Sequence, residues 1–257
     1  MEQLVELRRK NGVARITLNR PERLNAINIP MREALLAAIG AVQADEGVHI
    51  VVLDAAGRAF CAGQDLAERA PLLAGADIDL GQALQEGINR VVCALAGFRQ
   101  PVISLVQGAA VGAGTGLALS ADIVLASDEA RFDFNFARLG LVPDSGTSWL
   151  LPRRIGPARA AMTLLQGKAV SAREAVEWGL VAELAPDNDS LRNRGGELAA
   201  GLAGLSPETL RDCKALLAAS AGNTLPQQLD AEATGQSRAG RRRFYHEKLA
   251  AFLGVVT

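Results

Sequence analysis

Buried strands alternate with loops and helices through the middle of the chain, and this alternation is the strongest constraint on the fold. Pro101–Val106 and Ile123–Ala126 are short runs of mostly branched apolar residues, as in buried strands. Between them lie a glycine-rich stretch, Gly108–Gly116, and a short helical segment, Leu117–Ser120. His49–Leu53 is a third apolar run of strand length. Strands separated by helices in this way predict an α/β core.

Further patterns extend this prediction toward the N-terminus. Leu4–Leu7 and Val13–Leu18 flank the dipeptide Asn11-Gly12, which tolerates positive φ and therefore predicts a β-hairpin. Pro30–Ala44 and Leu80–Gly97 have apolar residues at helical spacing, so each segment predicts one helix.

The chain changes character after Thr147. Most of the sequence from there to residue 253 has a helical pattern, with one short strand expected near Gly179–Leu184. Asn223–Pro226 marks a break between two late helices. We therefore expect a core over residues 1–200, which binds and transforms a ligand, and a helical C-terminal region over residues 201–257.

Composition excludes several classes of protein. The 27 Lys and Arg against 28 Asp and Glu argue against a nucleic-acid binder with a basic surface. A hydrophobic fraction of 49% excludes a disordered chain. Met1–Lys10 lacks the apolar stretch of a targeting peptide, and no apolar run is long enough to cross a bilayer. Because 3 Cys are too few for a disulfide framework, we expect a cytoplasmic protein. The balanced charge and the short apolar runs predict no nucleic-acid and no membrane partner.

The glycine-rich stretch is the first candidate for chemistry. With 2 His in the whole chain, catalysis is expected to rest on carboxylates, backbone N–H groups or hydroxyls. Gly108–Gly116 precedes a helix, whose first N–H groups lack internal acceptors and can hold an oxyanion. Close packing and a dinucleotide site are the alternatives. The glycine spacing is GxGxG rather than GxGxxG, and no Gly-Lys-Ser/Thr follows, which weakens the nucleotide alternative.

A second loop, Arg58–Leu66, also follows a strand and precedes an expected helix. Gly63 permits an unusual backbone angle, so the Gln64 N–H can point into a cleft. On its own, the pattern favours an ordinary connection with Asp65 as a helix N-cap. Cys61 is interpreted as a buried thiol rather than a nucleophile, because no histidine is placed to activate it.

Asp144 is the carboxylate best suited to act as a general base. It lies in Gly140–Thr147, between an apolar run and a turn, and an apolar neighbourhood raises the pKa of a carboxyl group. Its spacing is equally consistent with capping a helix that begins near Thr147. Asp133 is a second-choice base in Arg131–Phe136, a strictly alternating run that predicts a half-buried strand with phenylalanines walling a pocket or the core.

Taken together, these segments resemble the crotonase family, also called the enoyl-CoA hydratase/isomerase superfamily. The resemblance implies a ClpP/crotonase-like α/β spiral of ββα units and a C-terminal helical region that builds homotrimers or dimers of trimers. It also implies an acyl-CoA thioester as substrate, with no cofactor besides its own coenzyme A and no metal. The matching segments follow the family order: Leu18-Asn19-Arg20-Pro21, Arg23-Leu24-Asn25-Ala26, Phe60–Leu66, Gly108–Asp122, Leu139–Pro152 and Ser171–Val181.

The resemblance also assigns site residues. The backbone N–H groups of Gln64 and Ala113 would hold the thioester oxygen, although the family usually has Gly at the second position. Arg23 would bind a CoA phosphate, and Lys248 would reach the CoA of a neighbouring subunit from the last helix. The remaining residues expected along the CoA are Leu24, Ala26, Ala62, Asp65 and Leu66.

The resemblance favours an isomerase. Hydratases of the family use two glutamates, and the matching positions here are Gly116 and Phe136, which cannot activate water. Asp144 stands where isomerases carry their acid, and one carboxylate suffices to move a proton between two carbons. An enoyl-CoA hydratase and a non-catalytic acyl-CoA binding protein are the alternatives. Gly57–Leu66 and Trp149–Arg153 are most similar to the subfamily of ring-1,2-epoxyphenylacetyl-CoA isomerases.

Overall fold

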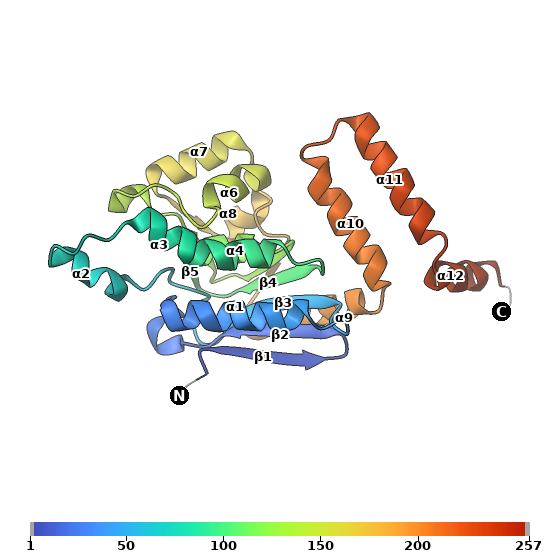
Figure 1. The fold of residues 1–257 in the computed structure, drawn as a ribbon, viewed down its shortest axis with the longest axis horizontal. Helices are drawn as coiled ribbons and strands as arrows, with labels where there is room; N and C mark the ends of the chain where they lie inside the picture. The colour runs from blue at the N-terminus through green and yellow to red at the C-terminus, as the bar shows by residue number, and fades with distance from the viewer. Residues whose placement is uncertain (1–2, 255–257) are drawn as a thin grey trace.

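A six-stranded sheet forms the centre of the molecule, for which a computed structural model describes residues 3–254 (Figure 1). The strand order is β1-β2-β3-β4-β6-β9. β1 and β2 are antiparallel, and all other neighbours in this sheet are parallel. The strands are β1 (Val5–Lys10), β2 (Val13–Leu18), β3 (Ile50–Ala55), β4 (Val102–Val106), β6 (Ile123–Ser127) and β9 (Glu183–Ala185).

The predicted N-terminal hairpin is confirmed. Asn11 and Gly12 have φ angles of 51° and 76°, the left-handed values that a two-residue hairpin turn requires. Lys10 pairs with Val13 directly across the turn. The hairpin places β2 in parallel register with β3 and leaves β1 as one edge of the sheet, with β9 at the other.

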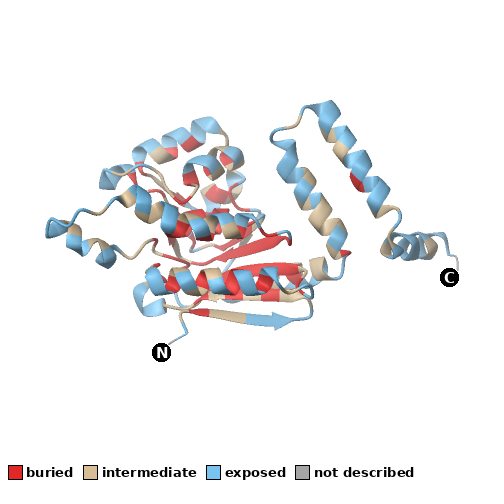
Figure 2. Ribbon diagram, in the orientation of Figure 1, coloured by how far each residue is buried: buried red, intermediate tan, exposed pale blue. Residues whose placement is uncertain are grey.

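Helices cover both faces of the sheet. Val51 and Leu53 of β3 belong to the larger apolar core, whereas Ile50 and Val52 belong to a second cluster on the opposite face. Figure 2 shows the buried residues concentrated along the sheet and the inner sides of its helices. Because β3 is buried on both faces, its first four residues, Ile50–Leu53, are a continuous apolar run. The larger core lies beneath α1 (Ile29–Gln43), α4 (Ile88–Ala96) and α5 (Ala113–Leu119), and the second lies beneath α9 (Asn188–Ala203).

A second sheet has three short strands in the order β5-β7-β8. They are β5 (Ala109–Val111), β7 (Arg131–Asp133) and β8 (Ala169–Ser171). The strand expected over residues 131–136 is therefore shorter than predicted, because the chain turns at Phe136 into the 3-10 helix η3 (Ala137–Leu139). Phe132, Phe134 and Phe136 are nevertheless buried. The alternation identified the inward side chains but not the end of the strand.

The single helix predicted over residues 80–97 is wrong, since two helices occupy that segment. They are α3 (Leu80–Glu86) and α4, and Gly87 separates them with φ and ψ both near −108°. A Cβ at Gly87 would lie 2.6 Å from Arg32 Nη1. The main-chain oxygen of Ala83 lies equally close, at 2.6 Å, so a side chain at residue 87 would meet both the backbone of α3 and the Arg32 side chain of α1.

Short helices complete the core around the loops. The 3-10 helix η1 (Pro21–Arg23) joins the first two matching segments of the sequence, and η2 (Leu66–Arg69) begins at the last residue of the third. The others are α2 (Ala70–Leu73), α6 (Thr147–Ile155), α7 (Pro157–Gln166) and α8 (Ala172–Glu177).

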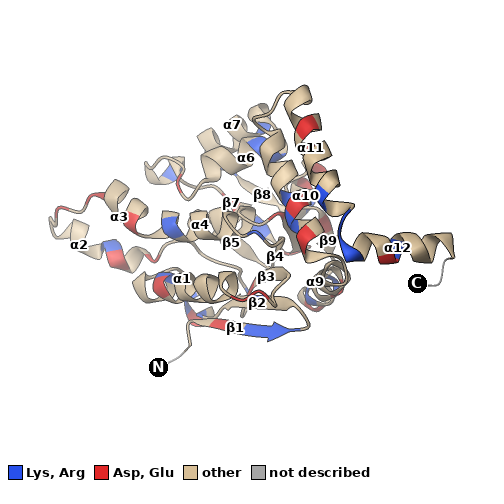
Figure 3. Ribbon diagram, turned by 45° about the vertical axis from the view of Figure 1, so that its right-hand side comes forward, with Lys and Arg blue, Asp and Glu red and all other residues tan. Residues whose placement is uncertain are grey.

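The last three helices form an arm that extends away from the core (Figure 1). They are α10 (Pro207–Ser220), α11 (Leu225–Ala239) and α12 (Arg243–Leu253), with the expected break between α10 and α11. Figure 3 shows basic and acidic residues interspersed over core and arm, with one run of bases at the end of β1 and another between α11 and α12. No helix within residues 3–254 combines the length and apolar character needed to span a bilayer. Residues 255–257 of the expected C-terminal region, like Met1 and Glu2, lie outside the described residues.

Adjacent glycines on α9 provide a matched test of its contact with the sheet. A Cβ at Gly195 would lie 2.6 Å from Leu105 Cδ1, whereas a Cβ at Gly196 meets nothing within 4 Å. We expect Gly196→Ala to raise the free energy of unfolding by about 0.5–1 kcal/mol through helix propensity. We expect Gly195→Ala to lower it by about 1–2 kcal/mol through overpacking. Urea unfolding followed by circular dichroism measures both, and equal effects would contradict the close contact.

Candidate active site

Backbone pairing brings the two predicted loops together. The Cys61 N–H donates to Ala109 O at 3.0 Å, and the Val111 N–H donates to Cys61 O at 2.9 Å. Gly63 follows with a φ of 91°, and a Cβ there would lie 2.7 Å from Val111 O and 3.6 Å from Ala113 N. The peptide that contains the Gln64 N–H therefore lies beside the first residue of α5.

The two predicted donors, the N–H groups of Gln64 and Ala113, make no hydrogen bond to the described protein groups. Gly112 has φ 52° and ψ −113°, which turns the chain so that α5 begins at Ala113. The N–H groups of a first helical turn have no acceptor within the helix. Among residues 3–254, neither the Gln64 N–H nor the Ala113 N–H donates to a backbone or side-chain acceptor. The Ala113 methyl group packs in the apolar core, so both N–H groups can serve one oxyanion.

The glycines of α5 serve close packing, one of the alternatives left open by the sequence. A Cβ at Gly114 would lie 2.8 Å from Cys61 Cβ, and a Cβ at Gly116 would lie 2.7 Å from Ser145 Cβ. Both are far inside normal van der Waals contact, so any side chain would push the loops away. Protein atoms fill the space over these glycines, which weakens the dinucleotide alternative further.

Asp144 does not cap the following helix. α6 begins at Thr147 with Gly146 as its N-cap and no side-chain capping bond. The contacts of Asp144 with Thr147 use its main-chain oxygen, which accepts from Thr147 N and Oγ1. The capping interpretation is therefore wrong, and the carboxylate is free to point elsewhere.

The Asp144 carboxylate lies against the first predicted donor residue. Gln64 Nε2 is 3.4 Å from Asp144 Oδ2, and Ser145 Oγ donates to Asp144 Oδ1 at 2.7 Å. Burial raises the pKa of Asp144, while the Ser145 hydrogen bond and the charge of Arg69 act in the opposite direction. A carboxyl group with a raised pKa is a more effective proton carrier near neutral pH.

The positions that match the hydratase glutamates hold no acid. Gly116 has no room for a side chain, because the carbonyl of Ser145 lies even closer to its missing Cβ than Ser145 Cβ does. Phe136 is buried, and its ring lies 3.7 Å from the position of a Cβ at Gly112. Phe134 is fully buried and belongs to the core. Asp144, in contrast, lies against the side chain of Gln64, the residue that carries one of the two free N–H groups.

The two segments predicted to bind CoA also lie against each other. Leu24 and Asn25 both adopt left-handed backbone angles, with φ of 51° and 55°. Asn25 is fully buried, and its Nδ2 donates to Ala56 O and Ala59 O, each at 2.9 Å. The Ala62 N–H donates to Leu24 O at 2.9 Å. These bonds place residues 23–26 next to residues 62–66, with Arg23 and Leu66 exposed and Ala26 and Ala62 half-buried.

Arg20 is a site residue that the sequence did not single out. Its Nη1 donates to Asp65 Oδ2 at 2.6 Å and to Ala26 O at 2.9 Å. Asp65 also caps η2 by accepting from the Ala67 N–H, as the N-cap interpretation predicted. The Arg20 hydrogen bond lowers the pKa of Asp65, so this carboxylate acts as a fixed brace between the segments. In the sequence, the only signal for Arg20 as the partner of Asp65 is its place in the matching motif Asn19-Arg20-Pro21.

One chain does not bring Lys248 to the other predicted CoA residues. Lys248 lies on α12, where its ammonium group is 5.2 Å from the centre of the Phe244 ring. Figure 1 places α12 and η1 at opposite ends of the molecule. A contact between Lys248 and CoA therefore needs a neighbouring subunit, as the resemblance implied, and stays a prediction.

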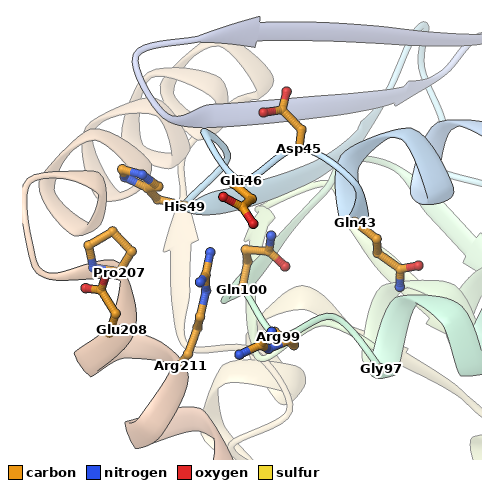
Figure 4. A pocket seen from close by; sticks show the side chains of 10 residues that line it. All are labelled: Gln43, Asp45, Glu46, His49, Gly97, Arg99, Gln100, Pro207, Glu208 and Arg211. Atoms are coloured by element: carbon orange, nitrogen blue, oxygen red, sulfur yellow. The ribbon is translucent and has the colours of Figure 1, made fainter.

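A separate cavity of about 450 Å³ contains none of the predicted site residues. It lies where the end of α1 and the segment before β4 meet the start of α10, and Figure 4 shows its lining. Its side chains include His49, Arg99 and Arg211 together with Asp45, Glu46 and Glu208. Such a mixed charged lining differs from the mostly apolar pockets that hold small molecules.

Thiol labelling tests the structural role of Cys61. Burial raises the pKa of Cys61 to about 12, and its Sγ lies 3.1 Å from Asn25 O, whereas Cys93 and Cys213 are exposed. The thiolate fraction of Cys61 at pH 8 should be about a thousandfold below that of an ordinary cysteine. We expect iodoacetamide to modify Cys93 in the native protein and to spare Cys61, as measured by peptide mass spectrometry. Equal labelling rates would restore the nucleophile hypothesis, and unfolding in urea should expose all three thiols.

The chain was compared with known families and proteins. The model of the enoyl-CoA hydratase/isomerase family matches residues 8–254. The chain is 42% identical to the 1,2-epoxyphenylacetyl-CoA isomerase of Escherichia coli K12, over 95% of this chain and 93% of the relative. It is 39% identical to a protein of Rhodobacter capsulatus described as a probable enoyl-CoA hydratase, over 94% of this chain and 91% of that one.

Solved structures agree with the sequence relatives. A protein from Mycobacterium abscessus, described as an enoyl-CoA hydratase/isomerase, superposes with a TM-score of 0.93 at 39% identity. The match covers 97% of this chain and 96% of that structure. The expected crotonase fold is thereby confirmed, and the chain belongs to the enoyl-CoA hydratase/isomerase family.

Proposed function

We propose that the protein is an acyl-CoA isomerase in which Asp144 moves the proton. The observation that carries this proposal is one half-buried carboxylate against the side chain of Gln64, whose own N–H is free. The glycine of α5 at residue 116 is at the same time pressed against Ser145, next to Asp144. The N–H groups of Gln64 and Ala113 hold the thioester oxygen of the substrate. Removing one such donor typically costs about 2.7–4 kcal/mol of transition-state stabilisation.

The proposed reaction needs a single acid–base group. With the thioester oxygen held by two N–H groups, a proton on a carbon conjugated to the carbonyl becomes acidic, and the Asp144 carboxylate removes it. The electron pair moves onto the oxygen and forms an enolate, which the donors stabilise. Asp144 then returns the proton to another carbon. Hydration requires a second carboxylate to position water, and positions 116 and 136 supply none.

The proposed acyl group is a ring-1,2-epoxyphenylacetyl group. Support comes from the Escherichia coli relative of that activity, at 42% identity over nearly the whole chain. The aromatic ring of Phe136 beside Gly112 is consistent with a flat acyl group near the donors.

The proposed CoA site consists of residues 23–26 and residues 62–66, the two segments that the Arg20–Asp65 hydrogen bond connects. Arg23 is exposed on η1 and can hold a phosphate, because its guanidinium fork matches phosphate oxygens. The backbone at Ala62 and Leu66 would meet the adenine, and Lys248 of a neighbouring subunit would close the site. We further propose that the arm builds a homotrimer or a dimer of trimers, because it exposes large apolar side chains that include Leu217, Leu249 and Phe252.

Asp144→Asn tests the proton carrier. We expect proton transfer to fall at least about a hundredfold, because the amide cannot accept a proton. Binding of the thioester should change little, since the N–H groups and the CoA segments remain. Deuterium uptake from heavy water into trans-3-hexenoyl-CoA and phenylacetyl-CoA, followed by mass spectrometry, measures the first quantity. Titration calorimetry measures the second.

Asp133→Asn is the matched control. The Asp133 main-chain oxygen accepts from the Gly112 N–H at 2.9 Å, and an asparagine keeps this bond. We therefore expect near-normal exchange. Loss of exchange in Asp133→Asn with its retention in Asp144→Asn would transfer the acid–base role to Asp133.

A hydratase is the second candidate, favoured by the Rhodobacter capsulatus relative. Wild-type protein with crotonyl-CoA separates the two reactions. We expect hydration to be at least about a hundredfold slower than isomerisation of a 3-enoyl-CoA, because only one carboxylate is present. Rapid formation of the 3-hydroxy thioester would make the protein a hydratase. Tight binding without exchange in any thioester would identify a non-catalytic acyl-CoA binding protein.

A further inference from the structure

Ser145, the residue after Asp144, has a backbone conformation that serine rarely adopts. Its φ is 52°, and the next residue, Gly146, has a φ of 78°. Only 1% of Ser145 is exposed. Glycine adopts left-handed angles at lower cost than any residue with a Cβ. The backbone therefore gives no reason for a serine here, and the hydroxyl group is the feature to explain.

The Ser145 hydroxyl is directed at the Asp144 carboxylate. Its Oγ donates to Asp144 Oδ1 at 2.7 Å, a short distance typical of a hydrogen bond to a charged oxygen. The Ser145 carbonyl and Cβ are at the same time pressed against the glycine of α5 at residue 116. Ser145 therefore connects the carboxylate to the helix that begins with Ala113.

The two oxygens of Asp144 are held unequally. Oδ1 has the short bond from Ser145, whereas Oδ2 has only the 3.4 Å contact with Gln64 Nε2. A bond of that length is weak. Oδ2 is thus the oxygen that can give up its contact with Gln64 and accept a substrate proton. It faces Gln64, whose backbone N–H is one of the two free donors.

We propose that Ser145 is a positioning residue, which fixes Asp144 through Oδ1 so that Oδ2 faces the substrate carbons. This inference rests on the proposed isomerase function and adds a residue to it. The hydroxyl bond favours the carboxylate form of Asp144 over the protonated form. It thereby opposes the effect of burial, which alone would leave the buried group protonated up to a higher pH.

Few other charges reach this carboxylate. Arg69 on η2 acts on Asp144 in the same direction as the hydroxyl bond. α5 contributes only uncharged side chains, and the contact of α4 near Gly146 is Val92. The basic residues of α6, Arg153 and Arg154, lie in its last turn. Ser145 and Arg69 are thus the groups that favour the carboxylate form of Asp144, whereas burial favours the protonated form.

Two substitutions separate the hydroxyl from the backbone. Ser145→Ala removes the hydroxyl and keeps a Cβ at the left-handed angle, whereas Ser145→Gly removes the hydroxyl and relaxes the backbone. We expect the two variants to differ in melting temperature but to share one kinetic change. In both, kcat on trans-3-hexenoyl-CoA should fall about tenfold or more, while KM stays within about twofold because the thioester contacts are intact.

The pH dependence gives a readout that a merely structural role would not move. Losing the hydroxyl bond raises the pKa of Asp144, and the reaction begins with the carboxylate form. The acid limb of the kcat/KM profile should therefore move to higher pH by about one unit in both variants. Carbon-13 NMR titration of aspartate-labelled protein, with the Asp144→Asn variant assigning the resonance, measures the same shift without any substrate.

The outcomes distinguish this inference from the proposed function. If Asp144→Asn is inactive but neither Ser145 variant shifts the NMR titration or the acid limb, Ser145 has no positioning role and the isomerase assignment stands. If kcat follows melting temperature, so that only one Ser145 variant loses activity, the hydroxyl is again not responsible. If Asp144→Asn keeps wild-type exchange, or the wild type shows none, the isomerase function itself fails.

Discussion

The close approach of α5 to two loops is the contact on which the candidate site depends. Gly114 lies against Cys61 and Gly116 against Ser145, without side chains between the backbones. The same helix presents the Ala113 N–H at its first residue. The separation of the donors from the acid is thereby set by backbone packing rather than by flexible side chains. Groups held in this way need no rearrangement as charge develops on a substrate.

Two carboxylates in neighbouring loops have opposite environments. Asp65 is bound by Arg20 and by a helix N–H, so its pKa is lowered and it stays ionised as a brace. Asp144 is held by a hydroxyl and a distant amide, and burial raises its pKa. The first environment suits structure and the second suits proton transfer. Each role follows from which charged partner the fold supplies.

Patterns set by neighbouring residues were predictable, and contacts between distant segments were not. The hairpin and the buried strands follow from turn chemistry and apolar runs, and the two candidate donor loops follow from glycines next to strands. The break at Gly87 has the Arg32 side chain of another helix packed against it, and the spacing of apolar residues does not report such a contact. The three-residue strand β8 is too short to have a period. The sequence left Asp144 between capping and catalysis, because its spacing does not show that Gly146 is the N-cap of α6 or that the carboxylate lies against Gln64, 80 residues earlier in the chain.

The packing at Gly116 also restricts how such a chain can change its chemistry over evolution. A glutamate at this position would have to displace the main chain of Ser145 and with it Asp144. Under the proposed mechanism, a single substitution toward the hydratase pattern would thus displace the acid before the second glutamate is in place. A sequence with that one substitution would catalyse neither isomerisation nor hydration. No path of single active intermediates would then lead from one reaction to the other. Crossing between them requires the helix and the turn to change together.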